Sequence, residues 1–229
     1  MARLVLWDID GTLVDSAGLG GEAFFEAFEK VTGRPVERRV PFAGRTDLEI
    51  ALDLLETAGI EHSERLLGDF EEALISSMAA RSERVRELGR ALPGVRQALE
   101  RFRAESHVTQ SLLTGNIRPN AHVKLGAFGL DELIDMEIGA YGSDHRRRGE
   151  LVAVARRKAL DIRGRNFDPA DIVLIGDTPL DVAAAIEGGA RAVGVATGPY
   201  DEAELRRSGA DAVLPDLSEL DDVLNAVLG

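Results

Sequence analysis

Cysteine is absent from the 229 residues of this chain. The absence excludes a disulfide framework, a zinc site built from thiolates and a cysteine nucleophile. It also fits a reducing compartment. Any chemistry that the protein performs must therefore rest on oxygen and nitrogen groups.

Long hydrophobic runs are missing as well, although 45% of the residues are hydrophobic. No segment approaches the roughly 18 consecutive apolar residues of a membrane-spanning helix. The N-terminus lacks the cationic and apolar regions of a secretory signal. We therefore expect a soluble, cytoplasmic protein with a globular core and no membrane partner.

Positive charge is scarce, since 27 basic residues stand against 40 acidic ones and the formal net charge is -13. An acidic surface repels polyanions, so nucleic acid is not an expected partner. A small phosphorylated molecule suits this chain only if a metal ion and a few cationic side chains gather positive charge inside the site. Simple solubility would explain the same charge balance.

Short apolar segments rich in β-branched residues alternate with longer helical segments along most of the chain. We expect strands at 3–7, 107–113, 133–138, 172–175, 192–196 and 212–214. We expect helices at 95–104, 118–128, 150–160 and 179–187, with another at the C-terminus. The alternation predicts an α/β fold, a doubly wound Rossmann-like parallel sheet covered by helices.

One stretch, residues 16–91, interrupts this rhythm with a helical pattern and no convincing strand. We interpret it as an inserted all-helical domain, called the cap, and residues 1–15 and 92–229 as the α/β core. Small residues at 16–21 suit a hinge, and a Leu-Pro-Gly turn at 92–94 precedes the return to the core. An insert after the first strand emerges near the carboxyl ends of the sheet, where open α/β folds bind ligands.

Two carboxylates, Asp8 and Asp10, follow the first expected strand. Their two-residue spacing directs both to one side as the chain leaves the sheet. The following Gly-Thr is also ordinary turn chemistry, so this pair alone is moderate support for a site. Asp177, after a later strand, adds a third carboxylate at the same edge. Converging carboxylates repel one another unless a hard cation lies among them, and oxygen ligands suit Mg²⁺.

Asp181 has two interpretations. It extends the acidic cluster beyond Asp177, which makes it a candidate metal ligand. The stretch from Thr178 to Asp181 also fits a capping box, with Pro179 at the first helical position. Both roles stay open at this point.

A third polar group, Thr114-Gly115-Asn116, follows the strand expected at 107–113. A hydroxyl, a close backbone approach at Gly115 and amide donors at a helix start can cradle phosphoryl oxygens. Thr114 or Asn116 would equally serve as a helix cap.

These segments, in this order, resemble the motifs of the haloacid dehalogenase-like superfamily, in its phosphoglycolate phosphatase-like and β-phosphoglucomutase-like branch with a helical cap. The resemblance implies that Asp8 is the nucleophile and Asp10 the general acid/base. It implies that Thr114 binds the transferred phosphoryl group. It also implies Mg²⁺ held by the carboxylates of Asp8, Asp177 and Asp181 and by the backbone carbonyl of Asp10.

The sequence departs from the family at its third motif, which usually supplies a lysine, because no lysine occurs between Lys124 and Lys158. Arg148 is the expected substitute, since a guanidinium can neutralise the nucleophile and phosphoryl oxygens. The run of three arginines that ends at Arg148 also fits the solvated start of a helix. Arg147 and Lys124 are the alternative substitutes for the missing lysine.

The expected reaction is hydrolysis of a small phosphorylated metabolite through an aspartyl-phosphate on Asp8. Asp10 would protonate the leaving alkoxide and then deprotonate the attacking water, which requires a pKa raised relative to its neighbour. Asp10 argues against dehalogenase and phosphonatase chemistry, neither of which needs it. A phosphomutase, a signalling receiver and a non-catalytic phospho-ligand binding protein are the alternatives.

Within the cap, Arg45 is a candidate for binding the polar or anionic end of the substrate. Thr46 to Glu49 also reads as a capping box, so a purely structural turn explains this segment equally well. Phe24, at helical spacing with other phenylalanines, fits packing better than substrate contact. Phosphoglycolate is one candidate substrate among several, and the sequence leaves the oligomeric state open.

Overall fold

The computed structural model describes residues 2–229, and its centre is a five-stranded parallel sheet in the order β4-β1-β5-β6-β7. The strands are β1 (Arg3–Trp7), β4 (Val108–Leu112), β5 (Ile172–Gly176), β6 (Arg191–Val195) and β7 (Ala212–Leu214). The expected doubly wound parallel sheet is confirmed.

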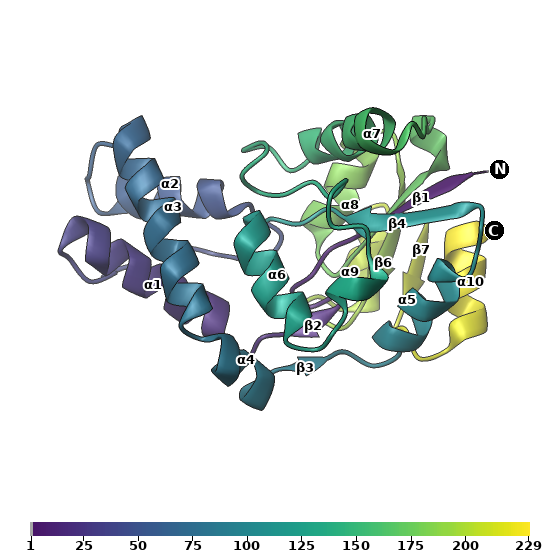
Figure 1. Cartoon of the computed structure of the whole chain (residues 1–229), viewed down its shortest axis with the longest axis horizontal. Helices are drawn as coiled ribbons and strands as arrows, with labels where there is room; N and C mark the ends of the chain where they lie inside the picture. Colours follow the sequence, from purple (N-terminus) through teal and green to yellow (C-terminus); the bar gives the residue numbers. More distant parts are fainter. Residues whose placement is uncertain (1) are drawn as a thin grey trace.

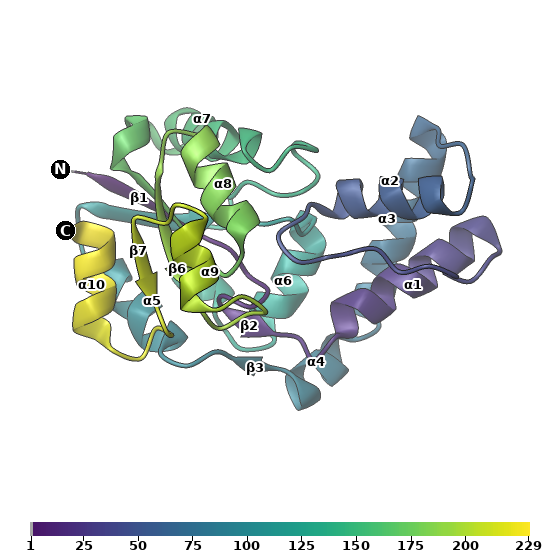
Figure 2. The same ribbon diagram turned by 180° about the vertical axis from the view of Figure 1, so that it is seen from behind.

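Alternation along β1 builds the two apolar layers of the core. Val5 and Trp7 belong to one buried cluster, and Leu4 and Leu6 belong to another. The first face is covered by α5 (Val95–Arg103), α6 (Arg118–Gly126) and α10 (Leu220–Leu228). The second is covered by α7 (Glu150–Arg163), α8 (Pro179–Glu187) and α9 (Glu202–Arg207). Figures 1 and 2 show these helices on opposite sides of the sheet.

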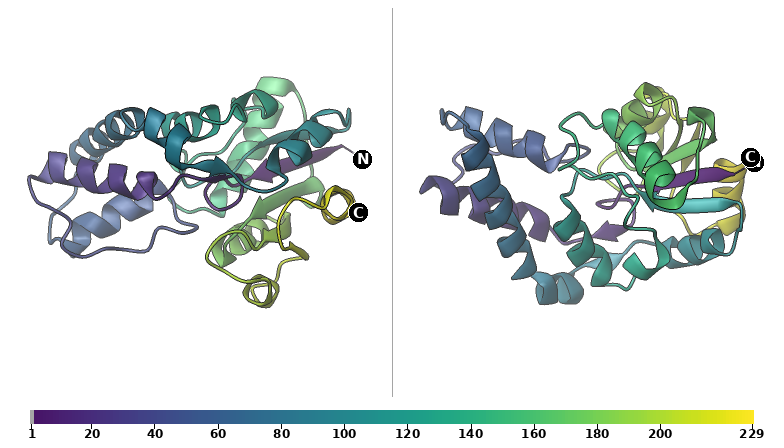
Figure 3. Two further views of the ribbon diagram at one scale, coloured as in Figure 1. Left: turned by 90° about the horizontal axis from the view of Figure 1, so that it is seen from below. Right: turned by 45° about the horizontal axis from the view of Figure 1, so that its top comes forward.

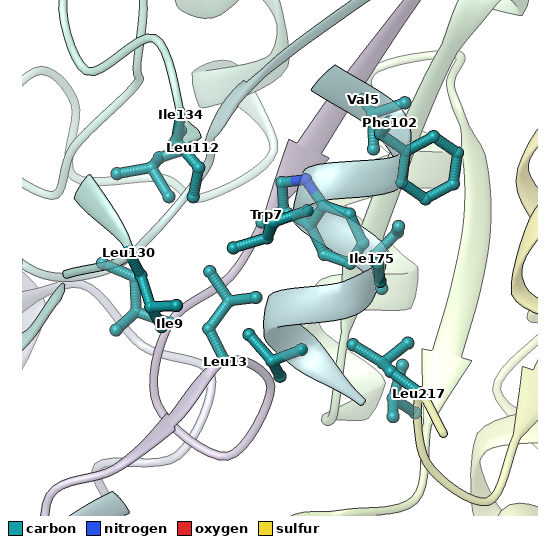
Figure 4. Close-up of a cluster of buried hydrophobic side chains, with 14 of the residues drawn as sticks. Val5, Trp7, Ile9, Leu13, Phe102, Leu112, Leu130, Ile134, Ile175 and Leu217 are labelled. Atoms are coloured by element: carbon teal, nitrogen blue, oxygen red, sulfur yellow. The ribbon is translucent and has the colours of Figure 1, made fainter. Parts of the chain in front are cut away.

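Trp7 anchors the end of β1 within the first apolar layer (Figure 4). It is fully buried, its ring centroid lies 5.8 Å from that of Phe102, and its indole N–H donates to Gln110 Oε1 at 3.3 Å. Removing a buried aromatic side chain of this kind costs ~3–5 kcal/mol. The strand end that carries Asp8 is thus firmly held.

The strand predicted at 133–138 is wrong. The chain instead forms a short 3₁₀ helix, η1 (Asp131–Leu133), and then runs irregularly along the edge strand β4. Only occasional backbone hydrogen bonds join it to β4, such as Asp135 N to Gln110 O at 3.1 Å and Ala140 N to Leu112 O at 2.9 Å. Ile134, Met136 and Ile138 are buried because this segment covers the sheet edge, which explains the misleading alternation. Helix α9 and a second 3₁₀ helix, η2 (Pro169–Asp171), were not predicted.

Four helices lie in the segment expected to form the cap, and they supply most of a third hydrophobic cluster, which Ile117 of the core joins. They are α1 (Leu19–Thr32), α2 (Asp47–Thr57), α3 (Glu64–Ala79) and α4 (Ser82–Leu88). Helices α1, α2 and α3 lie at one end of the molecule and both termini at the other (Figures 1 and 3). Two short antiparallel strands, β2 (Val14–Asp15) and β3 (Arg90–Ala91), pair where the chain leaves the core and returns to it. None of the helices in residues 2–229 is long and apolar enough to cross a membrane.

Candidate active site

The carboxyl end of β1 brings Asp8 and Asp10 to one cavity. The Asp8 N–H donates to the carbonyl of Ile175 at 2.9 Å, which continues the pairing of β1 with β5, and its side chain is buried. Asp10, two residues later, lines the same cavity, as the spacing predicts.

The turn that follows fits closely around Asp177. Gly11 has a φ of 78°, and a Cβ atom there would lie 2.3 Å from Asp177 Oδ2. The hydroxyl of Thr12 donates to Asp177 Oδ1 at 3.3 Å. The Gly-Thr pair after Asp10 therefore serves the acidic cluster as well as the turn, because only glycine leaves room for the carboxylate.

Three buried carboxylates meet at this edge of the sheet. Asp8, Asp177 and Asp181 each offer an oxygen within 4.8 Å of the other two. Asp181 also forms the capping box of α8: its Oδ2 accepts from the backbone N–H of Thr178 at 3.1 Å and from the hydroxyl at 2.7 Å. Both interpretations of Asp181 are thus compatible, since one side chain caps the helix and faces the cluster.

The charge balance of this cluster fits a divalent cation. Burial, opposed by Arg148 and reinforced by repulsion from Asp181 and Asp10, raises the pKa of Asp8 from 3.8 to about 7. Burial and the same kind of repulsion raise the pKa of Asp177 to about 9. One guanidinium does not neutralise the three carboxylates, and hard oxygen ligands in this number suit Mg²⁺.

Arg148 lies among the acids, just before α7. Its Nη2 donates to Asp8 Oδ1 at 2.6 Å and to Asp181 Oδ1 at 2.5 Å, and the residue is buried. Arg147, the alternative from the same run, is exposed and pairs with Glu187 at 3.6 Å. Of these two arginines, only Arg148 contacts the acidic cluster.

Lys124, the other alternative, contacts Asp10. Its Nζ lies 2.7 and 2.6 Å from the two carboxylate oxygens of Asp10 and 2.7 Å from Asn116 Oδ1. The amide of Asn116 donates to Asp10 Oδ2 at 2.8 Å, and the Ser16 hydroxyl donates to Oδ1 at 3.4 Å. Asp10 is thus held by three polar side chains.

This contact corrects the expected order of acidities. The loss of surrounding water would raise the pKa of Asp10, but Lys124, Asn116 and Ser16 outweigh it and hold that pKa below its usual value. Without a bound cation, Asp8 is therefore the weaker acid and Asp10 the stronger one, the reverse of the expectation. A cation among Asp8, Asp177 and Asp181 would lower the pKa of Asp8.

Thr114 lies beyond the end of β4, beside the Asp10 network. It is fully buried, its N–H donates to Ala140 O at 3.0 Å, and its hydroxyl accepts from the Asn116 amide at 2.9 Å. Gly115 and Asn116 line the cavity with it. The expected cradle residues are therefore together, and their contact with a phosphoryl group stays a prediction.

The cap touches the core at Gly115. A Cβ atom there would lie 1.9 Å from the carbonyl oxygen of Arg45, so glycine is needed for this approach. The Asp47 N–H donates to Gly115 O at 2.8 Å, and Asp47 Oδ2 accepts from the Ile117 N–H at 2.9 Å. Thr46 donates to Arg146 O at 3.0 Å. These bonds join the start of α2 to the loops that carry the site.

Arg45 lines the cavity, yet its guanidinium has partners on the cap. Nη2 pairs with Glu49 Oε1 at 3.0 Å and Asp53 Oδ2 at 2.7 Å, both on α2. Thr46 caps α2 by accepting from the Glu49 N–H at 3.2 Å. The structural turn is thus present, and the substrate-binding role of Arg45 stays a prediction.

Cap and core together enclose a cavity of ≈ 370 Å³. Its core side carries Asp8, Asp10, Thr114, Lys124 and Arg148. Its cap side carries the aromatic ring of Phe24 and the carboxylate of Asp47, among others. Burial, with a weaker opposing effect of Lys124, raises the pKa of Asp47 to about 7. A cavity of this size suits a small molecule.

The sequence model of the haloacid dehalogenase-like hydrolases matches residues 5–185, which span the acidic strand ends, the expected phosphoryl cradle and the segment expected to form the cap. The chain is a haloacid dehalogenase-like hydrolase.

Relatives of this haloacid dehalogenase-like hydrolase cover its whole length. "Probable phosphatase IndB" of Dickeya dadantii is 26% identical over 240 residues, covering 100% of this chain and 96% of the relative. A hydrolase from Pseudomonas syringae has a TM-score of 0.72 at 24% identity, covering 99% of both chains. A protein from Haemophilus somnus described as a predicted phosphoglycolate phosphatase has a TM-score of 0.67 at 20% identity, covering 97% of both chains. At these identities the two solved structures show the fold alone.

Three polar residues that line the cavity were either not predicted as site residues or considered only as an alternative. Lys124 was considered only as a replacement for Arg148, and Asp47 and Asn120 were assigned no role. A signal for Lys124 and Asn120 exists, because both fall on the buried face of α6 with Ala121 and Leu125, where a lysine needs a partner. No comparable signal marks Asp47.

Proposed function

We propose that this hydrolase is a Mg²⁺-dependent phosphatase of small phosphorylated metabolites, acting through an aspartyl-phosphate on Asp8. The observation that carries the proposal is Asp10, two residues after the buried Asp8 and facing the same cavity. Phosphoester hydrolysis needs an acid/base at this position, whereas dehalogenation does not.

Asp8 would attack phosphorus and displace the alkoxide of the substrate. Arg148, 2.6 Å from Asp8 Oδ1, would reduce repulsion between this carboxylate and the phosphoryl oxygens. The buried hydroxyl of Thr114 would orient the phosphoryl group. In-line positioning and charge neutralisation are the main demands of this reaction.

Asp10 would protonate the leaving oxygen and later take a proton from the water that hydrolyses the intermediate. Lys124 holds its carboxylate at 2.6 Å and favours the charged form, which suits the base step. The negative charge of the bound substrate phosphate, before its transfer to Asp8, would raise the pKa of Asp10 and favour the acid step.

The carboxylates of Asp8, Asp177 and Asp181 and the backbone carbonyl of Asp10 would hold Mg²⁺. When bound, the ion supplies positive charge that stabilises the phosphoryl oxygens and keeps Asp8 ionised. The buried acidic triad and the raised pKa values of Asp8 and Asp177 support this assignment.

We propose that residues 16–91 act as the cap and 1–15 and 92–229 as the catalytic core, with the cap excluding bulk water during the first step. The β2–β3 pairing at the two crossing points supports these boundaries, as does a hydrophobic cluster formed mainly by the cap helices.

A screen of phosphorylated metabolites with Mg²⁺, followed by phosphate release, tests the proposal. Wild type and Asp161→Asn, a variant in an exposed position on α7, should turn over at least one ester. Asp8→Asn should lose essentially all turnover, and Asp10→Asn should lose on the order of 10²- to 10⁴-fold. Unchanged turnover by Asp8→Asn would contradict the mechanism, and no turnover of any ester by wild type would contradict the function.

A further inference from the structure

The cap side of the cavity contains a cation that is already neutralised. The Arg45 side chain is only 12% exposed, and its guanidinium contacts Glu49 at 3.0 Å and Asp53 at 2.7 Å. Two carboxylates for one guanidinium leave this corner with net negative charge. A second anionic group on a substrate would have to displace these partners before Arg45 could bind it.

The other two cationic side chains that line the cavity also form ion pairs with carboxylates. Lys124 contacts Asp10 at 2.6 Å, and Arg148 contacts Asp8 at 2.6 Å and Asp181 at 2.5 Å. Both lie on the core side, where the transferred phosphoryl group requires them. Among the lining residues in 2–229, every cation therefore has a carboxylate partner within 3.0 Å.

Apolar side chains form much of the remaining cap wall. They are Phe24 on α1, Phe42 in the following loop, Ile50 on α2 and Met78 on α3. The ring centroids of Phe24 and Phe42 lie 5.3 Å apart, so they make a continuous surface. An anion placed against this wall would lose water without gaining a counter-charge, which is costly.

One hydrogen-bond acceptor, Asp47 at the start of α2, also lies on this wall. Asp47 is buried, lines the cavity and carries a carboxylate. A carboxylate in this position suits a hydroxyl or amino donor and opposes a second carboxylate or a phosphate.

We propose that the site selects phosphate monoesters whose alcohol is partly apolar, carries a hydrogen-bond donor and has no second anionic group. The proposal rests on the phosphatase function above. Its consequence is that phosphoglycolate and sugar bisphosphates are poor substrates, which also argues against a mutase that works through a bisphosphate.

Matched esters test the selectivity. We expect kcat/KM to be at least about tenfold higher for 2-hydroxyethyl phosphate than for phosphoglycolate, and for phenyl phosphate than for 4-carboxyphenyl phosphate. Equal or higher kcat/KM for the carboxylate member of both pairs would overturn the proposal. No turnover of any ester would instead count against the phosphatase function itself.

A second measurement tests the role of Arg45. The double variant Glu49→Gln/Asp53→Asn frees the guanidinium, so the ratio of kcat/KM for phosphoglycolate to that for 2-hydroxyethyl phosphate should rise by about tenfold or more. Adding Arg45→Met should remove the gain, and Glu56→Gln, exposed on the same helix, should leave the ratio unchanged. A ratio that does not respond in the folded double variant would overturn the assignment of selectivity to this ion pair.

Discussion

Lys124 changes the chemistry expected of Asp10. A carboxylate with a buried ammonium at 2.6 Å is ionised more easily than one in water, so we expect Asp10 to be ionised before the substrate binds. Protonation of the leaving oxygen by Asp10 would then require the negative charge of the substrate phosphate, which raises the pKa of Asp10. In the proposed mechanism, proton transfer would thus depend on Asp10, Lys124 and the phosphoryl group together.

Replacing Lys124 should reveal this coupling. In Lys124→Met the pKa of Asp10 rises, so the limb of the kcat/KM profile that reports Asp10 should move to higher pH. The rate at the optimum should fall by at least about tenfold, because Asp10 also loses its main positioning partner. Lys30→Met, an exposed lysine on α1, is the control. A pH profile identical to that of wild type would contradict this role of Lys124.

The site residues differ in how far the sequence predicts them. Asp8, Asp10 and Asp177 are predictable because the carboxyl ends of neighbouring parallel strands meet at one edge. The Lys124–Asp10 contact depends instead on how α6 crosses the sheet, which no local pattern encodes. Asp47 reaches the cavity only because the cap docks on Gly115.

At the scale of elements, the loop before α2 determines whether the cap meets the core. Gly44 has a φ of 73°, and a Cβ atom there would lie 2.4 Å from Thr178 Oγ1. Gly59 has a similar φ of 66° but no atom within 4 Å of such a Cβ. The two glycines share the same backbone requirement and differ in their distance from the site.

Gly44→Ala and Gly59→Ala form a matched pair. Each adds ~1–2 kcal/mol of backbone strain, but only Gly44→Ala pushes the loop away from Thr178. We expect kcat/KM to fall roughly 10- to 100-fold in Gly44→Ala, since small misplacements of this kind are costly, and to stay near wild type in Gly59→Ala. Thermal unfolding checks that both variants are folded. Similar kcat/KM values for the two would contradict the importance of this contact.

The elements themselves were predicted well where burial and periodicity agree. The strands β1, β5 and β6 are short, buried apolar runs, and α8 begins at Pro179 as its capping box indicates. The segment 133–138 misled the prediction because burial against an edge strand produces the same alternation as a strand. Helix α9 is too short to have a clear period.

At the scale of the whole molecule, the buried acids would link the proposed binding of Mg²⁺ to stability. The pKa of Asp8 is raised from 3.8 to about 7 and that of Asp177 from 3.8 to about 9. Between pH 3.8 and about pH 9 the metal-free native state therefore binds more protons than the unfolded state. The free energy of unfolding of the metal-free protein should therefore fall as pH rises through this range.

Mg²⁺ should reverse that loss. At about 100 times its Kd a ligand adds ~2.7 kcal/mol to the free energy of unfolding, so the melting temperature at pH 8 should rise with Mg²⁺ and fall again with a chelator. Asp177→Asn should respond much less, and Asp161→Asn should respond as wild type does. If the melting temperature of wild type at pH 8 were the same with and without Mg²⁺, the result would contradict the proposed metal site.

The proposed covalent intermediate on Asp8 gives the most direct test of the mechanism. Asp10→Asn lacks the base for hydrolysis of the intermediate, and p-nitrophenyl phosphate has a leaving group that needs no proton. Rapid quenching of this variant with Mg²⁺ and that ester, followed by peptide mass spectrometry, should find one phosphoryl group on Asp8. A phosphoryl group on any other residue, or none while the variant releases a burst of p-nitrophenol, would contradict it.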